Sequence, residues 1–307
     1  MRTYYSLGQG LPQLETYEEK CWISVELPDE DDMAFLTERL GIPHEFFSDI
    51  ADVDERPRTE REEEWTLTLL RIPLESNIPG LPYMTIPIGI ITGSKVTVSV
   101  CYRKSQLVPD FISHIRRKNI KIYSQSDFIV RLIYSSAVWF LKYLKLIYLE
   151  VNRAEKDLEQ SVRNEDLMRI MRLQKSLVYF STSIRGNEAM LGRLRSASKT
   201  SEIEEDLIED VAIELRQAYN TTNIYNDICT STMDALGSII SNNVNTIMKR
   251  MTSLSIVLTI PTMIASFYGM NVNVYLDQYP YAFIFIVIGA VLMSAIAFFL
   301  FRKIRWF

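Results

Sequence analysis

The sequence Tyr268-Gly269-Met270-Asn271 lies between two uncharged segments near the C-terminus. No charged residue occurs between Arg250 and Asp277, or between Asp277 and Arg302. A helix of about 20 apolar residues crosses a hydrocarbon core about 30 Å thick, so each segment is long enough to span a membrane. The sequence therefore predicts two transmembrane helices joined by a short outer loop. We place the first helix, the loop and the second helix at residues 251–271, 272–280 and 281–301.

The position of the Gly269-Met270-Asn271 motif, at the end of the first of two terminal spans, resembles the CorA family of magnesium channels. The motif-level resemblance covers residues 205–307, and elsewhere it rests on the order of the predicted elements. It implies a CorA-like funnel, in which a cytosolic α/β N-terminal domain is followed by long α-helices and the two C-terminal transmembrane helices. It also implies a homopentamer that takes up Mg²⁺ and is gated by intracellular Mg²⁺, with no organic cofactor.

The two parts of the chain differ in charge. From Lys249 onward there are five basic residues and one acid, whereas the preceding part holds 28 basic and 37 acidic residues. An acidic soluble part attracts cations and disfavours nucleic acid as a partner. Basic residues flank the outer ends of both spans and are absent from the loop, so the positive-inside rule places both termini, including the basic tail 302–307, in the cytoplasm. We expect a multi-pass protein of the cell membrane, in contact with lipid.

The sequence gives little support for an enzyme or for a secreted protein. It contains no Walker-type phosphate loop, and its two histidines, His44 and His114, are too few for a histidine-rich metal site. The N-terminus is polar and does not resemble a signal peptide. Cys21, Cys101 and Cys229 are isolated along the chain, so we expect buried thiols in a reducing cytosol.

Residues 1–125 are predicted to form the cytosolic α/β domain. Valines alternate with other residues in the last predicted strand, and Gly93-Ser94 predicts a hairpin turn before it. Asp31–Leu40 is predicted to be a helix, and the acidic run Asp29–Asp32 is either its solvated start or a metal site. The predicted strands are Cys21–Leu27, Trp65–Pro73, Tyr83–Thr92 and Lys95–Tyr102.

From residue 126 onward the chain is predicted to be almost entirely helical. Residues 126–201 read as a cytosolic hairpin of two helices, and a third helix begins near Glu202 and meets no proline before Pro261. The cytosolic part of this third helix, residues 202–250, forms a stalk that continues into the first span. Phe128–Val151 is also apolar, but charged residues interrupt it, so we predict a helix buried against other helices and not a third span.

One face of the long third helix carries small and polar residues in alternating steps of four and three. This period of 3.5 keeps them in one stripe along the helix. A polar stripe on a transmembrane helix faces water or another helix, because lipid leaves its hydrogen-bonding groups unsatisfied. Close packing of small residues is the alternative, and we favour pore lining by several copies because the stripe ends at the motif. Its members are Asp227, Ser231, Asp234, Ser238, Ser241, Asn245, Met248, Thr252, Ser255, Thr259, Thr262 and Ser266.

The resemblance implies roles along this stripe. Gly269, Met270 and Asn271 form the selectivity filter, where amides and main-chain carbonyls hold hydrated magnesium through its waters. We expect Gly269 to permit the backbone geometry that ends the helix. The pore-lining residues are Asn245, Met248, Thr252, Ser255, Thr259, Thr262 and Ser266.

Four residues are candidates for roles near the cytoplasmic side of the pore. Met248, together with Met251, is either a hydrophobic constriction that gates by dewetting or an ordinary pair of packed side chains. Asp227 and Asp234 are either acidic rings at the cytoplasmic mouth or solvated charges. Outside the membrane, the loop of residues 272–280 holds a single acid, Asp277, where many relatives carry a glutamate.

The resemblance also implies regulatory magnesium bound between neighbouring cytosolic domains. Asp210 occupies the position of one acidic ligand when the long helix is aligned without gaps from the motif. Its partner is expected at the end of the strand Trp65–Pro73, where Glu75 is the nearest carboxylate.

Two other functions remain open at this point. A transporter of the same superfamily specific for zinc, cobalt or nickel is one, although Met270 favours magnesium with cobalt and nickel as accompanying ions. The other is a membrane-tethered metal sensor or scaffold. A tether requires no polar stripe in its span, so the pattern from Thr252 to Ser266 argues against it.

Overall fold

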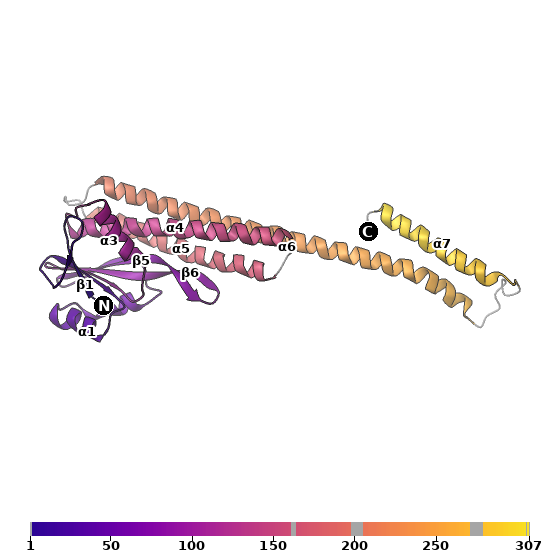
Figure 1. Cartoon of the computed structure of the whole chain (residues 1–307), viewed down its shortest axis with the longest axis horizontal. Coiled ribbons are helices and arrows are strands. Elements are labelled where there is room, and N and C mark those ends of the chain that lie inside the picture. Colours follow the sequence, from indigo (N-terminus) through magenta and orange to yellow (C-terminus); the bar gives the residue numbers. More distant parts are fainter. Residues whose placement is uncertain (1, 161–163, 198–204, 271–278, 305, 307) are drawn as a thin grey trace. The chain divides into compact units, whose positions relative to one another are not determined.

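The computed structural model describes residues 2–160, 164–197, 205–270, 279–304 and 306. The chain forms two compact units, Met1–Thr232 and Met233–Phe307. The first contains a β-sheet and most of the helices, and the second contains two long helical segments (Figure 1). Helix α6 (Glu205–Tyr268) begins in the first unit and continues into the second.

A seven-stranded sheet forms the base of the first unit, with strand order β2-β1-β3-β7-β6-β5-β4. The β3–β7 pair is parallel and the other pairs are antiparallel. The hairpin predicted at Gly93-Ser94 is confirmed, because β6 pairs antiparallel with β7 immediately after it. The strands are β1 (Arg2–Ser6), β2 (Gln13–Leu14), β3 (Cys21–Glu26), β4 (Arg58–Glu62), β5 (Trp65–Ile78), β6 (Leu81–Thr92) and β7 (Thr97–Cys101).

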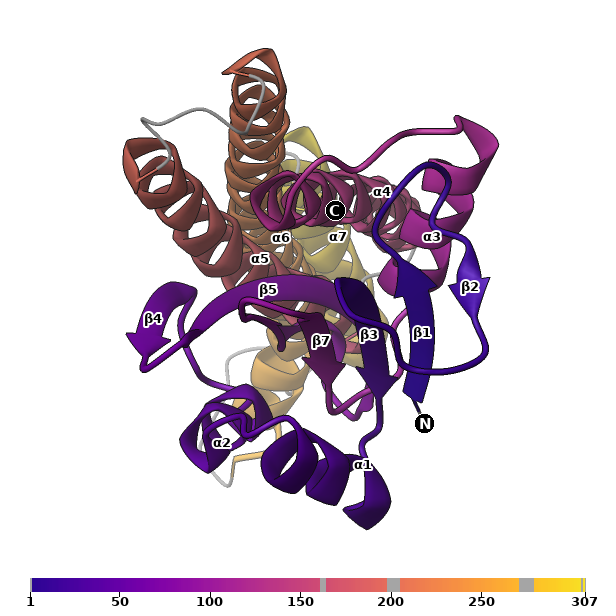
Figure 2. The ribbon, with the colours of Figure 1, turned by 90° about the vertical axis from the view of Figure 1, so that its left-hand side faces the viewer.

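One face of the sheet is covered by three short helical elements (Figure 2). Alternate residues of the strands, such as Ile23 and Val98, point to this face and pack against Phe46 in a buried core. Gly89 allows the close approach of the last of these helices, since a Cβ there would lie 2.2 Å from Cδ1 of Ile50. The elements are α1 (Glu30–Ala34), the short π-helix η1 (Phe35–Arg39) and α2 (His44–Ala51).

The acidic run Asp29–Asp32 lies at the start of helix α1. It does not form a metal-binding group of three or more side chains with other described residues. The side chain of Asp29 accepts a hydrogen bond from the backbone N–H of Asp32 at 2.7 Å, and this bond lowers the pKa of Asp29. Asp32 is buried and forms an ion pair with Arg2 at 2.8 Å. The run is therefore a helix cap, although Asp32 is not the solvated residue that we expected.

Helices α3 (Leu107–Arg117), α4 (Gln125–Gln160) and α5 (Asn164–Ala197) lie on the opposite face of the sheet (Figure 2). Trp22 of β3 is fully buried there, packs against Phe128 of α4 and donates a hydrogen bond to Ser99 Oγ at 2.9 Å. Both faces of the central strands are thus covered, which explains their nearly continuous apolar sequences. The sequence analysis missed β1, β2, β4, α2 and α3.

The start of α6 packs on α4 and α5. Tyr225 stacks on Tyr148 of α4 with ring centroids 5.0 Å apart, and Thr230 accepts a hydrogen bond from Gln174 of α5 at 2.9 Å. Cys229 is fully buried in this part of α6. All three cysteines are free and buried, which confirms the expectation of buried thiols.

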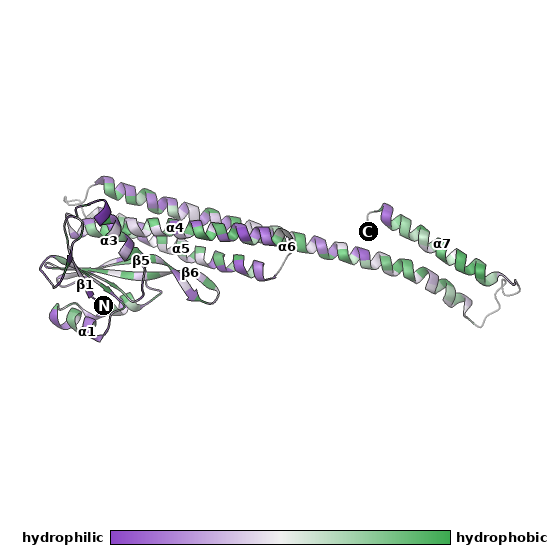
Figure 3. Ribbon diagram, in the orientation of Figure 1, coloured by the Kyte–Doolittle hydropathy of each residue, from purple (hydrophilic) through white to green (hydrophobic). Residues whose placement is uncertain are grey.

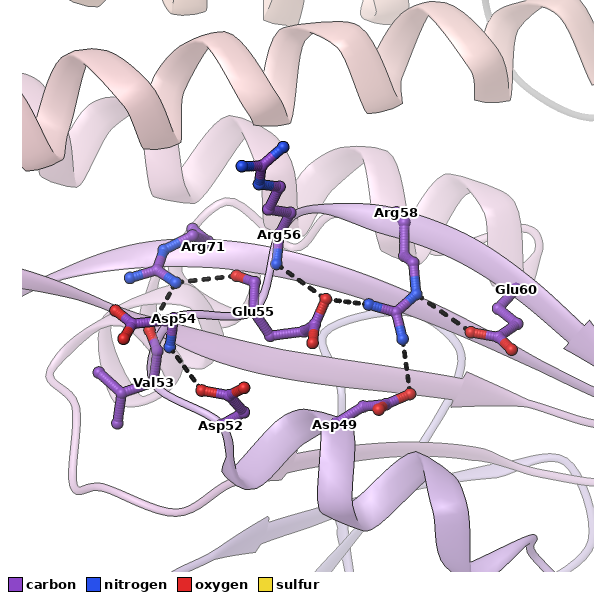
Figure 4. A network of polar contacts seen from close by, with 9 residues as sticks. All are labelled: Asp49, Asp52, Val53, Asp54, Glu55, Arg56, Arg58, Glu60 and Arg71. Carbon is purple, nitrogen blue, oxygen red and sulfur yellow. Dashed lines mark hydrogen bonds and ion pairs between the residues drawn. The ribbon is translucent and has the colours of Figure 1, made fainter.

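A buried arginine joins the sheet to the preceding loop and to α5. The Arg71 guanidinium on β5 donates hydrogen bonds to the carbonyls of Val53 and Glu55, at 2.6 and 2.8 Å, and to the side chain and carbonyl of Thr85. Nearby, Arg58 pairs with Asp49, Glu55 and Glu60 (Figure 4). Each of these three carboxylates is thus bound to the Arg58 guanidinium, and together they form an ion-pair network (Figure 4).

The second unit contains the remainder of α6 and α7 (Ala282–Lys303). Helix α7 is mainly apolar, whereas polar and apolar residues alternate along this part of α6 (Figure 3). By length and composition three described helices can span a membrane, namely α4, α6 and α7, but 44% of the apolar window of α4 is buried inside the fold, against 6% for each of the others. This burial agrees with the prediction that α4 packs against other helices.

Candidate ion pathway

The α6 helix ends at Tyr268, and Gly269 and Met270 follow it in a tightened last turn. The N–H of Gly269 donates to the carbonyls of Ala265 and Ser266, at 3.0 and 3.2 Å. The N–H of Met270 donates to the carbonyl of Phe267 at 3.4 Å. Asn271, the third residue of the motif, lies outside the described residues, as does most of the predicted outer loop, including Asp277.

The structure does not support the expected conformational role of Gly269. Its φ is not in the left-handed region, and an added Cβ would make ordinary contacts of 3.4 and 3.5 Å with the carbonyl oxygens of Ala265 and Ser266. The turn can therefore be formed by residues other than glycine. Both of these carbonyls accept from the N–H of Gly269, and each keeps a second lone pair.

The hydroxyl groups of the predicted stripe share one hydrogen-bonding arrangement. Ser255, Thr259 and Thr262 each donate to the backbone carbonyl four residues earlier, at 2.9, 2.7 and 3.0 Å. A hydroxyl has one donor and two acceptor lone pairs, so these groups are left as acceptors on an exposed helix face. Thr252, Ser266 and Asn245 are also exposed on α6.

The two candidate gate residues are exposed apolar side chains. Met248 is 62% exposed and Met251 61% exposed, so neither belongs to a core within this chain. Further toward the N-terminus, Asp234 is exposed in the second unit, and Asp227 is exposed in the first. Neither aspartate forms an ion pair with a described residue.

The two candidate regulatory carboxylates lie on different elements of the first unit. Asp210 is exposed on α6 and lines a pocket between α3, α4 and α6 that does not include Glu75. Strand β5 continues to Ile78, so Glu75 is not at the strand end but inside the β5–β6 hairpin, opposite Tyr83. Among the described residues no group of three or more His, Cys, Asp or Glu side chains forms a metal site within the chain.

Comparison with known proteins identifies the family. The sequence model described as CorA-like Mg2+ transporter protein matches residues 17–303, which is nearly the whole chain. The chain belongs to the CorA-like magnesium transporter family. The predicted resemblance to the CorA family is thereby confirmed.

Individual CorA relatives match over similar lengths. The cobalt/magnesium transport protein CorA of Methanocaldococcus jannaschii is 25% identical over 302 residues, covering 93% of this chain and 90% of that protein. The complete structure of the CorA magnesium transporter from the same organism has a TM-score of 0.85 at 22% identity, covering 100% of this chain and 99% of that one. This structural match confirms the predicted CorA-like order of an α/β domain, long helices and C-terminal apolar helices.

Two more distant structures share the fold. The full-length CmaX protein matches with a TM-score of 0.69 at 15% identity, covering 99% of this chain and 97% of that one. The cytoplasmic domain of ZntB from Vibrio parahaemolyticus matches with a TM-score of 0.62 at 14% identity, covering 78% of this chain and 98% of that one. At these identities the likeness concerns the fold alone.

The sequence analysis missed the polar residues that share a pocket with Asp210. His114 and Lys118, at the C-terminal end of α3, line this pocket together with Arg131 and Tyr134 of α4. Helix α3 was not predicted, so nothing in the sequence connected these residues with a carboxylate about 90 positions later. The amphipathic spacing of Phe111 and Ile115, both buried, is the signal that would have revealed the helix.

Proposed function

We propose that this chain is the subunit of a divalent-cation channel that takes up Mg²⁺ across the cell membrane. The observation that carries the proposal is the row of Ser255, Thr259 and Thr262 on α6, whose hydroxyl donors are bound to the helix and whose acceptor lone pairs are exposed. The waters around a magnesium ion point their hydrogens outward and need acceptors. Because Mg²⁺ loses these waters reluctantly, a pore lined with neutral acceptors suits the hydrated ion.

The motif provides the selective end of this pathway. The carbonyls of Ala265 and Ser266 beside Gly269 keep a second lone pair, and together with the amide of Asn271 they would form a ring of oxygen acceptors when several subunits surround an axis. No fixed carboxylate lies between Arg250 and the motif, so the ion meets no strong anionic ligand within the span. Cobalt and nickel are expected to pass with magnesium.

A channel of this kind requires several subunits, because one chain with two spans cannot enclose a pore. We propose a homopentamer, the state implied by the family resemblance, with the α6 span lining the pore and α7 facing lipid. The apolar surface of α7 supports a lipid-facing position. Both termini are placed in the cytoplasm by the basic residues that flank the spans.

Uptake needs no nucleotide hydrolysis. A divalent cation moving inward gains about 4.6 kcal/mol per 100 mV, from about 2.3 kcal/mol per elementary charge. Asp227 and Asp234 concentrate cations at the cytoplasmic mouth, and Met248 with Met251 forms the constriction. Intracellular Mg²⁺ closes the channel through Asp210, with Glu75 of a neighbouring subunit as the proposed second carboxylate.

The decisive experiment is magnesium uptake into liposomes that contain the purified protein, a fluorescent Mg²⁺ indicator and an inside-negative potential. We expect uptake by the wild type, loss of uptake in Asn271→Ala, and retained uptake in the matched control Asn273→Ala, which removes another amide two residues further on. Loss in both variants would refute a specific role for Asn271.

The alternative functions give different results in the same assay. A folded, oligomeric wild type that transports Zn²⁺ but not Mg²⁺, with low internal Mg²⁺, would identify a zinc transporter of the same superfamily. A tethered sensor would transport neither ion and would be unaffected by Asn271→Ala.

A further inference from the structure

The first unit contains a pocket that the transport pathway does not use. It has a volume of about 370 Å³ and lies between α3, α4 and the start of α6. This volume is within the range of small-ligand sites, which are mainly apolar with a few convergent polar groups. Its apolar wall is formed by Phe111, Ile115, Ile120, Val138 and Leu207.

The pocket lining includes two cations, Lys118 and Arg131. Lys118 is exposed and forms no ion pair with a described residue, and the Nε atom of Arg131 binds buried Asp127 at 2.7 Å. That ion pair fixes the Arg131 guanidinium, and no described residue accepts from its two Nη atoms. Burial lowers the pKa of His114, which also lines the pocket, and Lys118 lowers it further, so His114 is a neutral side chain here at pH 7.

The pocket also has two acidic lining residues. Asp210 lines it from α6 and forms no ion pair with a described residue, whereas Asp110, the other acid of the lining, is bound by Lys142 at 2.7 Å. Tyr134 lies beside Asp210: desolvation raises the pKa of its hydroxyl, and Glu214 and Asp210 raise it further. The pocket lining therefore combines two cations, one carboxylate without an ion pair to a described residue, and apolar side chains of α3, α4 and α6.

A ligand that matches this pattern has an anionic group, a cation and an apolar body. We propose that the pocket binds a small phosphate-bearing organic anion as its magnesium complex, with Lys118 and Arg131 on the phosphate and Asp210 on the metal. This inference rests on the proposed function in one respect, since Asp210 is there the ligand of regulatory Mg²⁺. Guanidinium and ammonium groups are the usual partners of phosphate, and magnesium is commonly held by one carboxylate together with phosphate oxygens.

This arrangement couples the two ligands. Magnesium at Asp210 neutralises the carboxylate that would otherwise repel the anion, and the anion supplies further oxygen ligands to the metal. Each ligand therefore raises the affinity for the other by the same factor. The regulatory magnesium of this chain would then respond to the concentration of a phosphorylated metabolite as well as to that of the free ion.

Isothermal titration calorimetry on the full-length protein in detergent tests the proposal, with adenosine diphosphate as the probe in the presence and absence of Mg²⁺. We expect saturable binding that requires Mg²⁺ and is weakened about tenfold in Lys118→Ala, the effect of losing one charged hydrogen bond. The control Arg117→Ala removes the neighbouring charge, which does not line the pocket, and should leave the affinity within twofold. Asp210→Asn should abolish the dependence on Mg²⁺.

Several outcomes would overturn the proposal: no saturable binding to folded wild type with Mg²⁺ present, equal binding with and without Mg²⁺, or equal weakening by Lys118→Ala and Arg117→Ala. Pyrophosphate is the comparison ligand, because it has the phosphates of adenosine diphosphate without the organic group. Equal affinity for the two ligands would overturn the role of the apolar wall. The assay involves no flux, so failure here with intact Mg²⁺ uptake leaves the channel proposal standing. Binding of the probe without Mg²⁺ uptake in liposomes would support the pocket proposal and contradict the channel proposal.

Discussion

Asn187 on α5 binds the backbone of Arg71 on β5 through both ends of its amide. Arg71 N–H donates to Asn187 Oδ1 at 3.0 Å, and Asn187 Nδ2 donates to Arg71 C=O at 2.7 Å. Asn187 is fully buried, and the side chain of Arg71 holds the loop of residues 53–55 from the same point (Figure 4). The position of α5 on the sheet is thus fixed by a polar contact inside an apolar interface.

Asn187→Ala should destabilise the first unit by about 2–5 kcal/mol, because it leaves a buried N–H and a buried C=O without partners. Thermal unfolding followed by tryptophan fluorescence would measure the loss, since Trp22 and Trp65 are buried in this unit. Asn220→Ala, at an exposed position of α6, is the matched control and should change the melting temperature little. Equal melting of both variants would show that the contact does not hold α5 in place.

The sequence predicted the elements whose physical signals are local. The uncharged spans, the valines of β7 and the helix predicted from residue 126 follow from composition and periodicity. The start of that helix has a local cause as well, because Ser124 Oγ accepts from the N–H of Asp127 at 3.1 Å. The polar stripe also followed from spacing alone, and pore lining by it stays a prediction, because residues off the stripe, such as Leu258 and Met263, are exposed on this part of α6 as well.

The missed features depend on contacts between distant residues. Strand β1 pairs with β3 and is too short and polar to be recognised alone, and the extension of β5 past Pro73 depends on β6, which pairs with it as far as Leu81. This extension is why Glu75 was wrongly placed after the strand end. The Asp210 pocket brings together residues of three helices, a proximity that no single-sequence pattern encodes.

Thr262→Val should reduce magnesium uptake about fivefold to tenfold. The substitution replaces the Thr262 hydroxyl by a methyl group of similar size, so each subunit loses one hydrogen-bond acceptor from the pore lining. Thr262→Ser, which keeps the hydroxyl, should restore most of the flux. Thr246→Val is the control: Thr246 also donates to the carbonyl four residues earlier, at 2.9 Å, but lies off the stripe. The liposome assay measures all three, and normal flux in Thr262→Val would remove the hydroxyl row from the pathway.

Met248→Ser should raise magnesium flux severalfold when internal Mg²⁺ is high, because a polar residue at a constriction favours wetting. Met263→Ser is the control, since Met263 is also exposed on α6 but lies outside the stripe. Fluxes are compared in liposomes loaded with millimolar Mg²⁺. If the two variants leak equally, the effect reflects a disturbed membrane helix and Met248 is not the gate.

The buried cysteines give a test of the packing of α6 in solution. Burial raises the pKa of Cys229 to about 11 and that of Cys101 to about 12, so only about 10⁻³ or less of either thiol is ionised at pH 7.5. Iodoacetamide should therefore leave both unmodified in the folded protein and alkylate them in denaturant, as measured by mass spectrometry. Because folding raises these pKa values, their stabilising contribution is complete below the unfolded value of about 8.5 and is lost as the pH rises toward 11–12. Rapid alkylation of Cys229 in folded protein at pH 7.5 would instead show that the start of α6 separates readily from α4 and α5, and would contradict the stacking of Tyr225 on Tyr148.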